Sequence, residues 1–258
     1  MNLQVILETF NSLNPHEQIK FLYEKLSSLP QEYQIPFLLA TINDEKTPPI
    51  VLATALKFLP KSGYKNRDVL HQFLKNPHPA VTQAAKRALS ELSILEEKDI
   101  DRSKPGVQSK ESSYRKQRKL KTLKEMVKIN ASWVPKVLLE DLEDSNEEIR
   151  DFIVNELACR EGLNLNTVHQ KLFDAPWYIK SSILKLLARL KNPLSISYIE
   201  EVVNDSNSEV RQSAARTLGE IGGEKASELL IRLAKDQNPY VRKSAEEALE
   251  KTSTLKFI

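Results

Sequence analysis

One ten-residue segment of this chain occurs twice, and this repetition constrains the fold more than any other feature. Residues 205–214 read Asp-Ser-Asn-Ser-Glu-Val-Arg-Gln-Ser-Ala, and residues 236–245, 31 positions later, read Asp-Gln-Asn-Pro-Tyr-Val-Arg-Lys-Ser-Ala. Related segments recur at intervals of 30 or 31 residues toward the N-terminus. A period of this length predicts an array of similar supersecondary units, because repeats of 20–50 residues are typical of solenoids.

Each repeat carries an apolar helical face. Positions zero, four and eight, counted from a Val or Ile, are mostly apolar and would lie on one side of a helix. An Asp or Asn stands five residues earlier, shifted by one in the second repeat, and suits an N-cap or a tight turn. A second apolar stretch lies upstream, so the pattern predicts a helical hairpin per repeat. Position zero is held by Ile19, Ile50, Val81, Ile149, Ile179, Val210 and Val241.

The motif Asp-x-Asn-x-x-Val-Arg-x-x-Ala-x-x-x-Leu-Gly over residues 205–219 resembles HEAT repeats. It is most similar to their short bacterial, phycobilisome-lyase-like subclass, and the resemblance is strongest from Asn204 to Leu249. It implies an all-α fold, an α-α superhelix of about seven helical hairpins with a period of 31 residues, whose second helices line the inner surface. The family also implies a role in binding other macromolecules.

Composition excludes several other classes of protein. Six glycines in 258 residues are few for Rossmann folds, phosphate loops or hairpin-rich sheets, which need glycine at their turns. The single cysteine excludes internal disulfides and multi-thiolate metal sites. The sequence has no apolar run long enough to span a membrane, and residues 1–10 lack the basic and long apolar regions of a secretory leader, so we expect none. We therefore expect a cytoplasmic protein.

The regular spacing is interrupted in the middle of the chain. Residues 96–113 are polar and contain a Pro-Gly pair, which predicts a flexible loop. This loop would separate N-terminal HEAT-like repeats over 1–95 from a basic helix and C-terminal HEAT-like repeats over 114–258. From Arg102 to Lys128 there are ten Lys or Arg and two Glu, whereas the whole chain has a net charge of only +3.

This local charge has two interpretations. It could contact the phosphates of a nucleic acid, an anionic surface or an acidic protein. It could equally be a solvated helix face next to a disordered loop, as runs of charge usually are. The candidate basic strip, within the possible contact region 102–128, comprises Arg115, Lys116, Arg118, Lys119, Lys121, Lys124 and Lys128.

Five further residues are candidates for binding a partner. Arg87, Lys185 and Arg216 share position six and would form an interrupted basic stripe if second helices line the inner face; ordinary surface cations explain them as well. Trp177 and Tyr178 begin a second helix where other repeats carry mostly polar or turn-forming residues. Trp177 is either an exposed interface anchor or a cover for the preceding turn.

Three recurring features favour structural roles. An Asp precedes an Arg by six residues in three repeats, which predicts a ladder that joins turns to helices rather than a catalytic pair. Gly219, Gly222 and Gly223 are predicted to end a helix. Cys159 is interpreted as a buried apolar side chain. The Asp–Arg pairs are Asp144 with Arg150, Asp205 with Arg211, and Asp236 with Arg242.

Motifs for catalysis or metal binding are missing from the sequence. There is no Gly-rich phosphate loop, Gly-x-Ser-x-Gly or His-Glu-x-x-His pattern. The pair His16-Glu17 is similar to those of the di-iron hydroxylases built from helical repeats, but these need several such pairs. We expect no metal, no cofactor and no enzymatic activity.

The leading hypothesis is a non-enzymatic scaffold or adaptor that binds a protein with the surface of its solenoid. A nucleic-acid-binding protein, including a helical-repeat DNA glycosylase, is an alternative, although its inner positions are mixed in sign. A chromophore lyase subunit is a further alternative, implied only by the repeat subclass.

Overall fold

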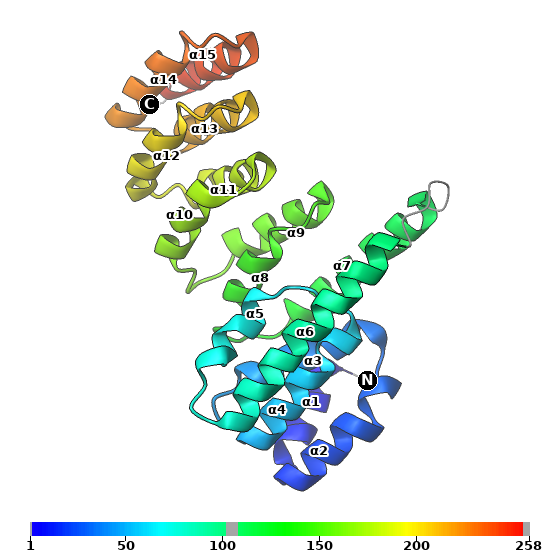
Figure 1. The fold of residues 1–258 in the computed structure, drawn as a ribbon. Coiled ribbons are helices and arrows are strands. Elements are labelled where there is room, and N and C mark those ends of the chain that lie inside the picture. Colours follow the sequence, from blue (N-terminus) through cyan, green and yellow to red (C-terminus); the bar gives the residue numbers. More distant parts are fainter. Residues whose placement is uncertain (1, 102–107, 255–258) are drawn as a thin grey trace. The chain divides into compact units, whose positions relative to one another are not determined.

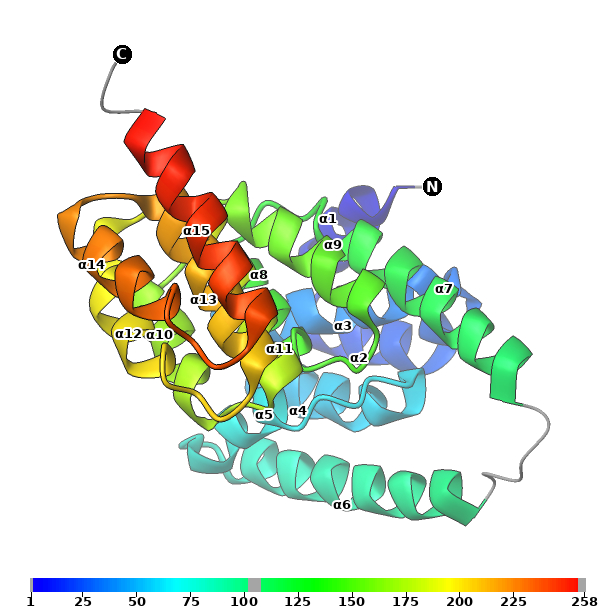
Figure 2. The same ribbon diagram turned by 90° about the horizontal axis from the view of Figure 1, so that it is seen from above.

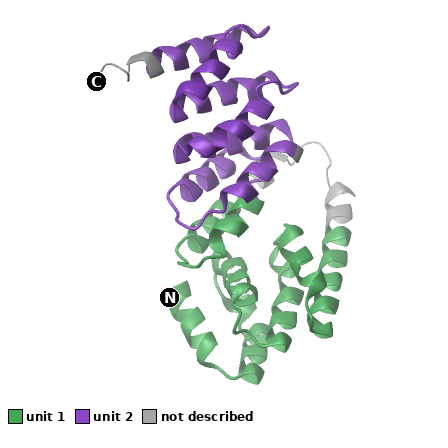
Figure 3. Ribbon diagram, turned by 90° about the vertical axis from the view of Figure 1, so that its left-hand side faces the viewer, with its two compact units in different colours: residues 1–140 green, residues 141–258 purple. Residues whose placement is uncertain are grey.

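A computed structural model describes residues 2–101 and 108–254. Over these residues the protein is entirely helical, with no strand, which confirms the all-α prediction and the pairing of helices into HEAT-like hairpins. The chain divides into two compact units, residues 1–140 and 141–258 (Figure 3). Each unit is a stack of helical hairpins.

The first unit contains two layers of helices. α1 packs on α3 in one layer, and α2, α4 and α6 follow one another in the other, with α4 and α6 side by side (Figure 2). α7 also packs against α3. The helices are α1 (Leu3–Ser12), α2 (Pro15–Glu24), α3 (Gln31–Asn43), α4 (Pro49–Phe58), α5 (Asp68–His71), α6 (Pro79–Asp101), α7 (Gln108–Met126) and α8 (Val134–Asp141).

The second unit repeats the same two-layer plan. Its second helices α9, α11, α13 and α15 pack in sequence, while α10, α12 and α14 form the other layer (Figure 1). The helices are α9 (Glu147–Ala158), α10 (Leu165–Asp174), α11 (Trp177–Leu190), α12 (Ile196–Val202), α13 (Ser208–Ile221), α14 (Glu224–Leu233) and α15 (Pro239–Thr254).

The apolar positions of the second unit are as predicted. Position zero is buried in all four of its repeats, at Ile149, Ile179, Val210 and Val241. The Asp five residues before position zero forms the predicted turn rather than the N-cap in three repeats, where its side chain accepts from the backbone N–H two residues later. The side chains of Asn146 and Asn207 accept backbone hydrogen bonds at the starts of α9 and α13, which satisfies N–H groups that a helix leaves unpaired.

The apolar face of the first two repeats is not the predicted one. Ile50 is 56% exposed, and its neighbour Val51 is fully buried instead. Likewise Tyr23 is 54% exposed, whereas Leu22 is buried. A helix turns by roughly 100° per residue, so a register error of one residue is enough to move a side chain from the core to the surface. Ile50 lines a groove that is described below.

The predicted loop is shorter than 96–113. α6 continues to Asp101 and α7 begins at Gln108, and the residues between them lie outside the described part of the chain. The boundary between the units falls after residue 140, because α7 packs on α3 and so residues 114–140 belong with the N-terminal repeats. α8 and α9 therefore fall on either side of this boundary.

The predicted ladder of Asp and Arg residues is confirmed. In each of the three repeats Arg Nη1 donates to the carbonyl of the Asp six residues earlier and to the next carbonyl, at 2.7–3.2 Å. Arg211 also donates to the carboxylate of Asp236 in the following repeat. Lys180 makes the equivalent contact with Asp205, at 2.8 Å. The ladder thus joins turn to helix and repeat to repeat.

Two smaller predictions are wrong. Gly219 lies inside α13, where a Cβ atom would be 2.6 Å from the Cβ of Ala248, so glycine permits the close approach of α15. Gly222 does end the helix, with a φ of 72°. Cys159 is exposed, because α9 ends there and the residue faces away from the core.

Candidate partner-binding site

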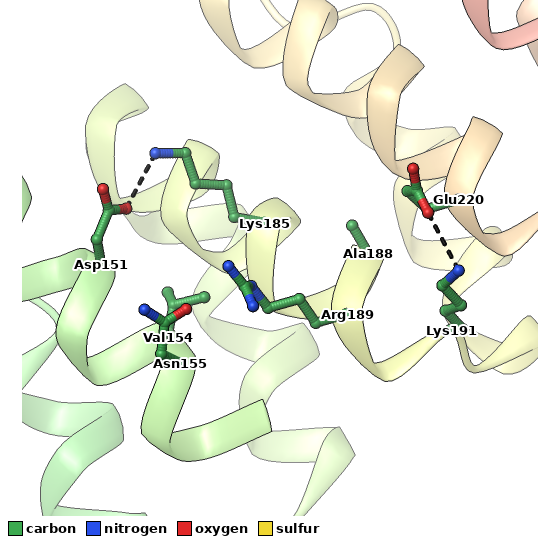
Figure 4. Close-up of a pocket in the computed structure, with 8 residues that line it drawn as sticks. All are labelled: Asp151, Val154, Asn155, Lys185, Ala188, Arg189, Lys191 and Glu220. Atoms are coloured by element: carbon green, nitrogen blue, oxygen red, sulfur yellow. Dashed lines mark hydrogen bonds and ion pairs between the residues drawn. The ribbon is translucent and has the colours of Figure 1, made fainter. Parts of the chain in front are cut away.

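The exposed face of the second helices in unit 2 has a cavity of about 450 Å³. It lies across α9, α11 and the end of α13, so consecutive repeats contribute to it (Figure 4). Most of its lining side chains are polar or charged. They are Asp151, Val154, Asn155, Lys185, Ala188, Arg189, Lys191 and Glu220.

Ion pairs within the chain occupy both ends of this cavity. Lys185 Nζ lies 3.0 Å from Asp151 Oδ1 and 3.4 Å from Glu147 Oε1. Lys191 Nζ lies 3.1 Å from Glu220 Oε2, and Lys251 contacts the same carboxylate. Hydrogen bonds from Lys251 and Lys191 lower the pKa of Glu220, so it stays ionised. These charges are compensated within the protein.

Arg189 differs from these neighbours. Its exposed side chain extends from α11 toward Asn155 of α9 (Figure 4). Arg216 is exposed on α13, the next second helix. Neither guanidinium forms an ion pair with any residue that the structure describes. A guanidinium presents five N–H donors in a planar fork that matches a carboxylate or phosphate. The face can therefore bind an anionic group.

The predicted basic stripe is not continuous. Arg87 lies on α6 in the first unit. In the second unit Lys185 is paired with two carboxylates, whereas Arg216 forms no ion pair with a described residue. Our sequence reasoning missed Arg189, which stands at position ten. The equivalent residues of the other repeats in this unit are Cys159, Glu220 and Lys251. Because none of these residues at position ten is aliphatic or aromatic, the sequence could have indicated that this position is exposed.

The two members of the predicted aromatic pair differ in exposure and in the contacts that they make. Trp177, the first residue of α11, is 49% exposed, and its ring meets that of Tyr178 edge to face at 5.8 Å. The ring of Tyr178 lies 5.1 Å from the guanidinium of the buried Arg150, so it supports the ladder. Trp177 is thus the accessible member. Tyr240, at the position of Tyr178 two repeats later, is also exposed and was not predicted.

The members of the candidate basic strip, which lie on α7 and just after it, differ in their contacts. Arg118 is half-buried and donates to the carbonyl of Ser62 at 3.0 Å. Lys128 pairs with Glu125 at 2.6 Å, and this hydrogen bond raises the pKa of the lysine. Lys121 and Lys124 are exposed. The remaining members, which have interactions elsewhere within the chain, are Arg115, Lys116 and Lys119.

The described residues contain no membrane-spanning helix and no metal-ligand cluster. Among them, no helix has both the length and the apolar character needed to cross a bilayer. No three His, Cys, Asp or Glu side chains of this part of the chain come together in a metal-binding group. The predicted absence of a metal and of a cofactor stays a prediction.

Solved repeat proteins share limited similarity with the chain. Human deoxyhypusine hydroxylase is 17% identical, with 98% of this chain and 84% of that chain covered and a TM-score of 0.38. A designed armadillo repeat protein is also 17% identical, with 84% and 99% covered and a TM-score of 0.36. Another, solved in complex with the peptide (KR)4, is 16% identical, with 85% and 99% covered and a TM-score of 0.36.

Comparison by sequence gives one positive result. A search of curated proteins found no match. The family model for HEAT repeats matches residues 165–250, which are the three hairpins from α10 to α15.

Proposed function

We propose that this protein is a non-enzymatic scaffold or adaptor that holds a protein partner on the exposed face of the second helices in unit 2. The observation that carries the proposal is the contrast within one cavity. Lys185 and Lys191 are neutralised by carboxylates of the chain, whereas Arg189 has no ion pair with a described residue. A carboxylate of the partner could form with Arg189 the charge-assisted hydrogen bonds that no described residue of the chain provides.

Two neighbouring features support a protein as the partner. Arg216 extends the unpaired positive charge onto the next repeat. Trp177 offers a large, half-exposed ring, and tryptophan and arginine are enriched among the residues that dominate binding energy at protein interfaces. The proposal that the chain is not an enzyme rests on the sequence, which carries no nucleophile motif or phosphate loop.

The test is a pull-down with the tagged whole chain from its native host, with and without nuclease. We expect a stoichiometric protein that survives nuclease and is lost with the double variant Arg189→Glu and Arg216→Glu. The control, Arg232→Glu with Lys235→Glu, makes the same charge change at exposed positions in and after α14. Equal recovery with both variants would show that this face is not the binding site.

Nucleic acid is the other outcome of this experiment. Material that co-purifies with the chain and is removed by nuclease and by salt would indicate electrostatic binding to phosphates. Lys121 and Lys124 would then be the first residues to replace, since they are exposed members of the basic strip that form no ion pair with a described residue. That result would overturn the adaptor proposal.

A further inference from the structure

A second groove lies in the first unit, between α4 and α6. Its volume is about 300 Å³, and it is lined by residues of these two helices and of the turn that follows α4. Its lining combines small apolar side chains with cations. The lining residues are Ile50, Ala53, Thr54, Lys57, Lys61, Ala80, Gln83, Ala84, Arg87, Ala88 and Glu91.

The apolar residues of the lining, here called its floor, are Ile50, Ala53, Ala80, Ala84 and Ala88. Ile50 is 56% exposed although it lies in a helix whose other face packs tightly. Its alanine neighbours are short, so a side chain of another molecule could reach the helix backbone between α4 and α6. On the adjacent helix α2, the exposed Tyr23 meets Phe58 edge to face at 5.1 Å and continues this apolar surface.

Two cations of the groove contact aromatic rings. Lys57 Nζ lies 5.4 Å from the ring centre of Tyr23 and 3.1 Å from its hydroxyl oxygen. Lys61 Nζ lies 5.8 Å from the ring centre of Phe58. An aromatic ring orients a cation but does not cancel its charge. This arrangement contrasts with Lys185 of unit 2, which carboxylates neutralise.

Arg87 adds a third positive charge from the opposite wall, and its exposed side chain has no ion pair with a residue in the described part of the chain. Glu91 is the single carboxylate in the lining, so the groove carries a net positive charge. Low-lying apolar surface with cations around it is complementary to a segment that carries both aliphatic and acidic side chains.

We propose that the α4–α6 groove binds an acidic segment of a protein partner that inserts an aliphatic side chain beside Ile50. Carboxylates of that segment would pair with Lys57, Lys61 and Arg87. This inference rests on the proposed function as a protein-binding protein, and it names a separate surface and the chemistry of what it takes. The aliphatic floor favours a peptide, because burial of an aliphatic side chain there removes apolar surface of both molecules from water.

The experiment is a selection of random 15-residue peptides displayed on phage against the whole chain. We expect the enriched peptides to be rich in Asp and Glu and to contain Leu, Ile, Val or Met. Fluorescence anisotropy with one enriched peptide should show about tenfold weaker binding by the variant Lys57→Glu with Arg87→Glu. Ile50→Asp should weaken it similarly, since it places a carboxylate where the aliphatic side chain inserts.

The matched control is Lys121→Glu with Lys124→Glu, which makes the same charge change in the same unit, on α7, and should leave the affinity unchanged. Circular dichroism of each variant checks that it is folded. Tighter binding of a 15-nucleotide DNA or RNA than of the peptide would overturn the proposal, as would enrichment of basic peptides or no enrichment at all.

The outcomes separate this inference from the proposed function. If enriched peptides bind and the groove variants have no effect, the groove is not the site and the adaptor function still stands. If the pull-down yields no protein partner and the selection enriches nothing, both fail together.

Discussion

The guanidinium of Arg211 donates two hydrogen bonds to the carboxylate of Asp236, at 2.7 and 3.0 Å, across the boundary between two repeats. Both side chains are more than nine-tenths buried. The hydrogen bonds from Arg211 lower the pKa of Asp236, so the carboxylate stays ionised where it is paired. This pair is the most enclosed connection between α13 and the turn that precedes α15.

We predict that Asp236→Ala lowers the free energy of unfolding by about 3 kcal/mol, because it leaves a buried guanidinium without its counter-charge. Asp205→Ala should have a smaller effect, since Lys180 makes one hydrogen bond and is more exposed. Urea denaturation followed by circular dichroism measures both. Equal losses would show that burial of the pair does not determine its contribution.

Gly219→Ala should be destabilising even though alanine is the better helix former. The new Cβ would lie 2.6 Å from that of Ala248, so α13 and α15 must separate. Overpacking of this kind costs about 1–3 kcal/mol, against a gain of about 1 kcal/mol from helix propensity. The companion change Ala248→Gly should restore part of the loss in the double variant. If Gly219→Ala raises the melting temperature, the helices are not in contact here.

Arg118→Ala should destabilise the first unit, although the sequence places this residue in the basic strip. Its guanidinium bonds to the carbonyl of Ser62, and loss of a charged hydrogen bond costs about 1.5–3 kcal/mol. Lys121→Ala, three residues along the same helix, should change stability by less than about 0.5 kcal/mol. Thermal denaturation of the two variants tests the distinction, which fails if they unfold alike.

A buried histidine predicts a pH dependence of stability. His169 is 2% exposed, hydrogen-bonds Ser195 at 3.0 Å and stacks on Tyr198 with ring centres 3.9 Å apart. Burial lowers the pKa of His169, so the unfolded chain binds a proton more readily than the folded one. The contribution of the neutral, buried His169 to the free energy of unfolding is therefore fully present above the unfolded-state pKa of about 6.5. It is lost as the pH falls below that value toward the folded-state pKa.

The measurement is urea denaturation of the wild type and of His169→Phe at several pH values from 7 to 5. The variant keeps a ring beside Tyr198 and should lose less stability over this range than the wild type, even if it starts lower. A parallel slope in His169→Phe would place the titrating group elsewhere.

The fold of the second unit could be predicted because the same pattern, a polar turn followed by apolar helix positions, occurs in four consecutive repeats. Val210 and Val241 are buried, as their shared position predicts, and the Asn caps follow the same spacing. Because the apolar positions, the caps and the turns all indicate the same register, only one face of each helix can be the buried one.

The buried helix faces of the first unit could be predicted less well, because the residues that compete for the buried position are adjacent in sequence and similar in type. Ile50 and Val51 are both β-branched and apolar, and only the point at which α4 begins after Pro48 determines which one is buried. In the same way, apolar spacing does not indicate that α6 continues beyond Leu95 to Asp101.

The candidate site depends on contacts between repeats, which sequence spacing does not show. Lys185 and Arg216 share a position, yet Lys185 is neutralised by Asp151 from the preceding repeat and Arg216 has no such partner in the described residues. The charge that a surface offers is what remains after these pairings. The sequence predicts a site on this face but does not show which of its cations lack an ion pair.

The ladder has a mechanical consequence. Lys180 with Asp205, and Arg211 with Asp236, each join only neighbouring repeats, so a pull along the second unit loads these connections in series. The connection with one hydrogen bond should yield before the one with two. The unit would then lengthen in steps, one repeat at a time, and absorb tension without losing its whole structure at once.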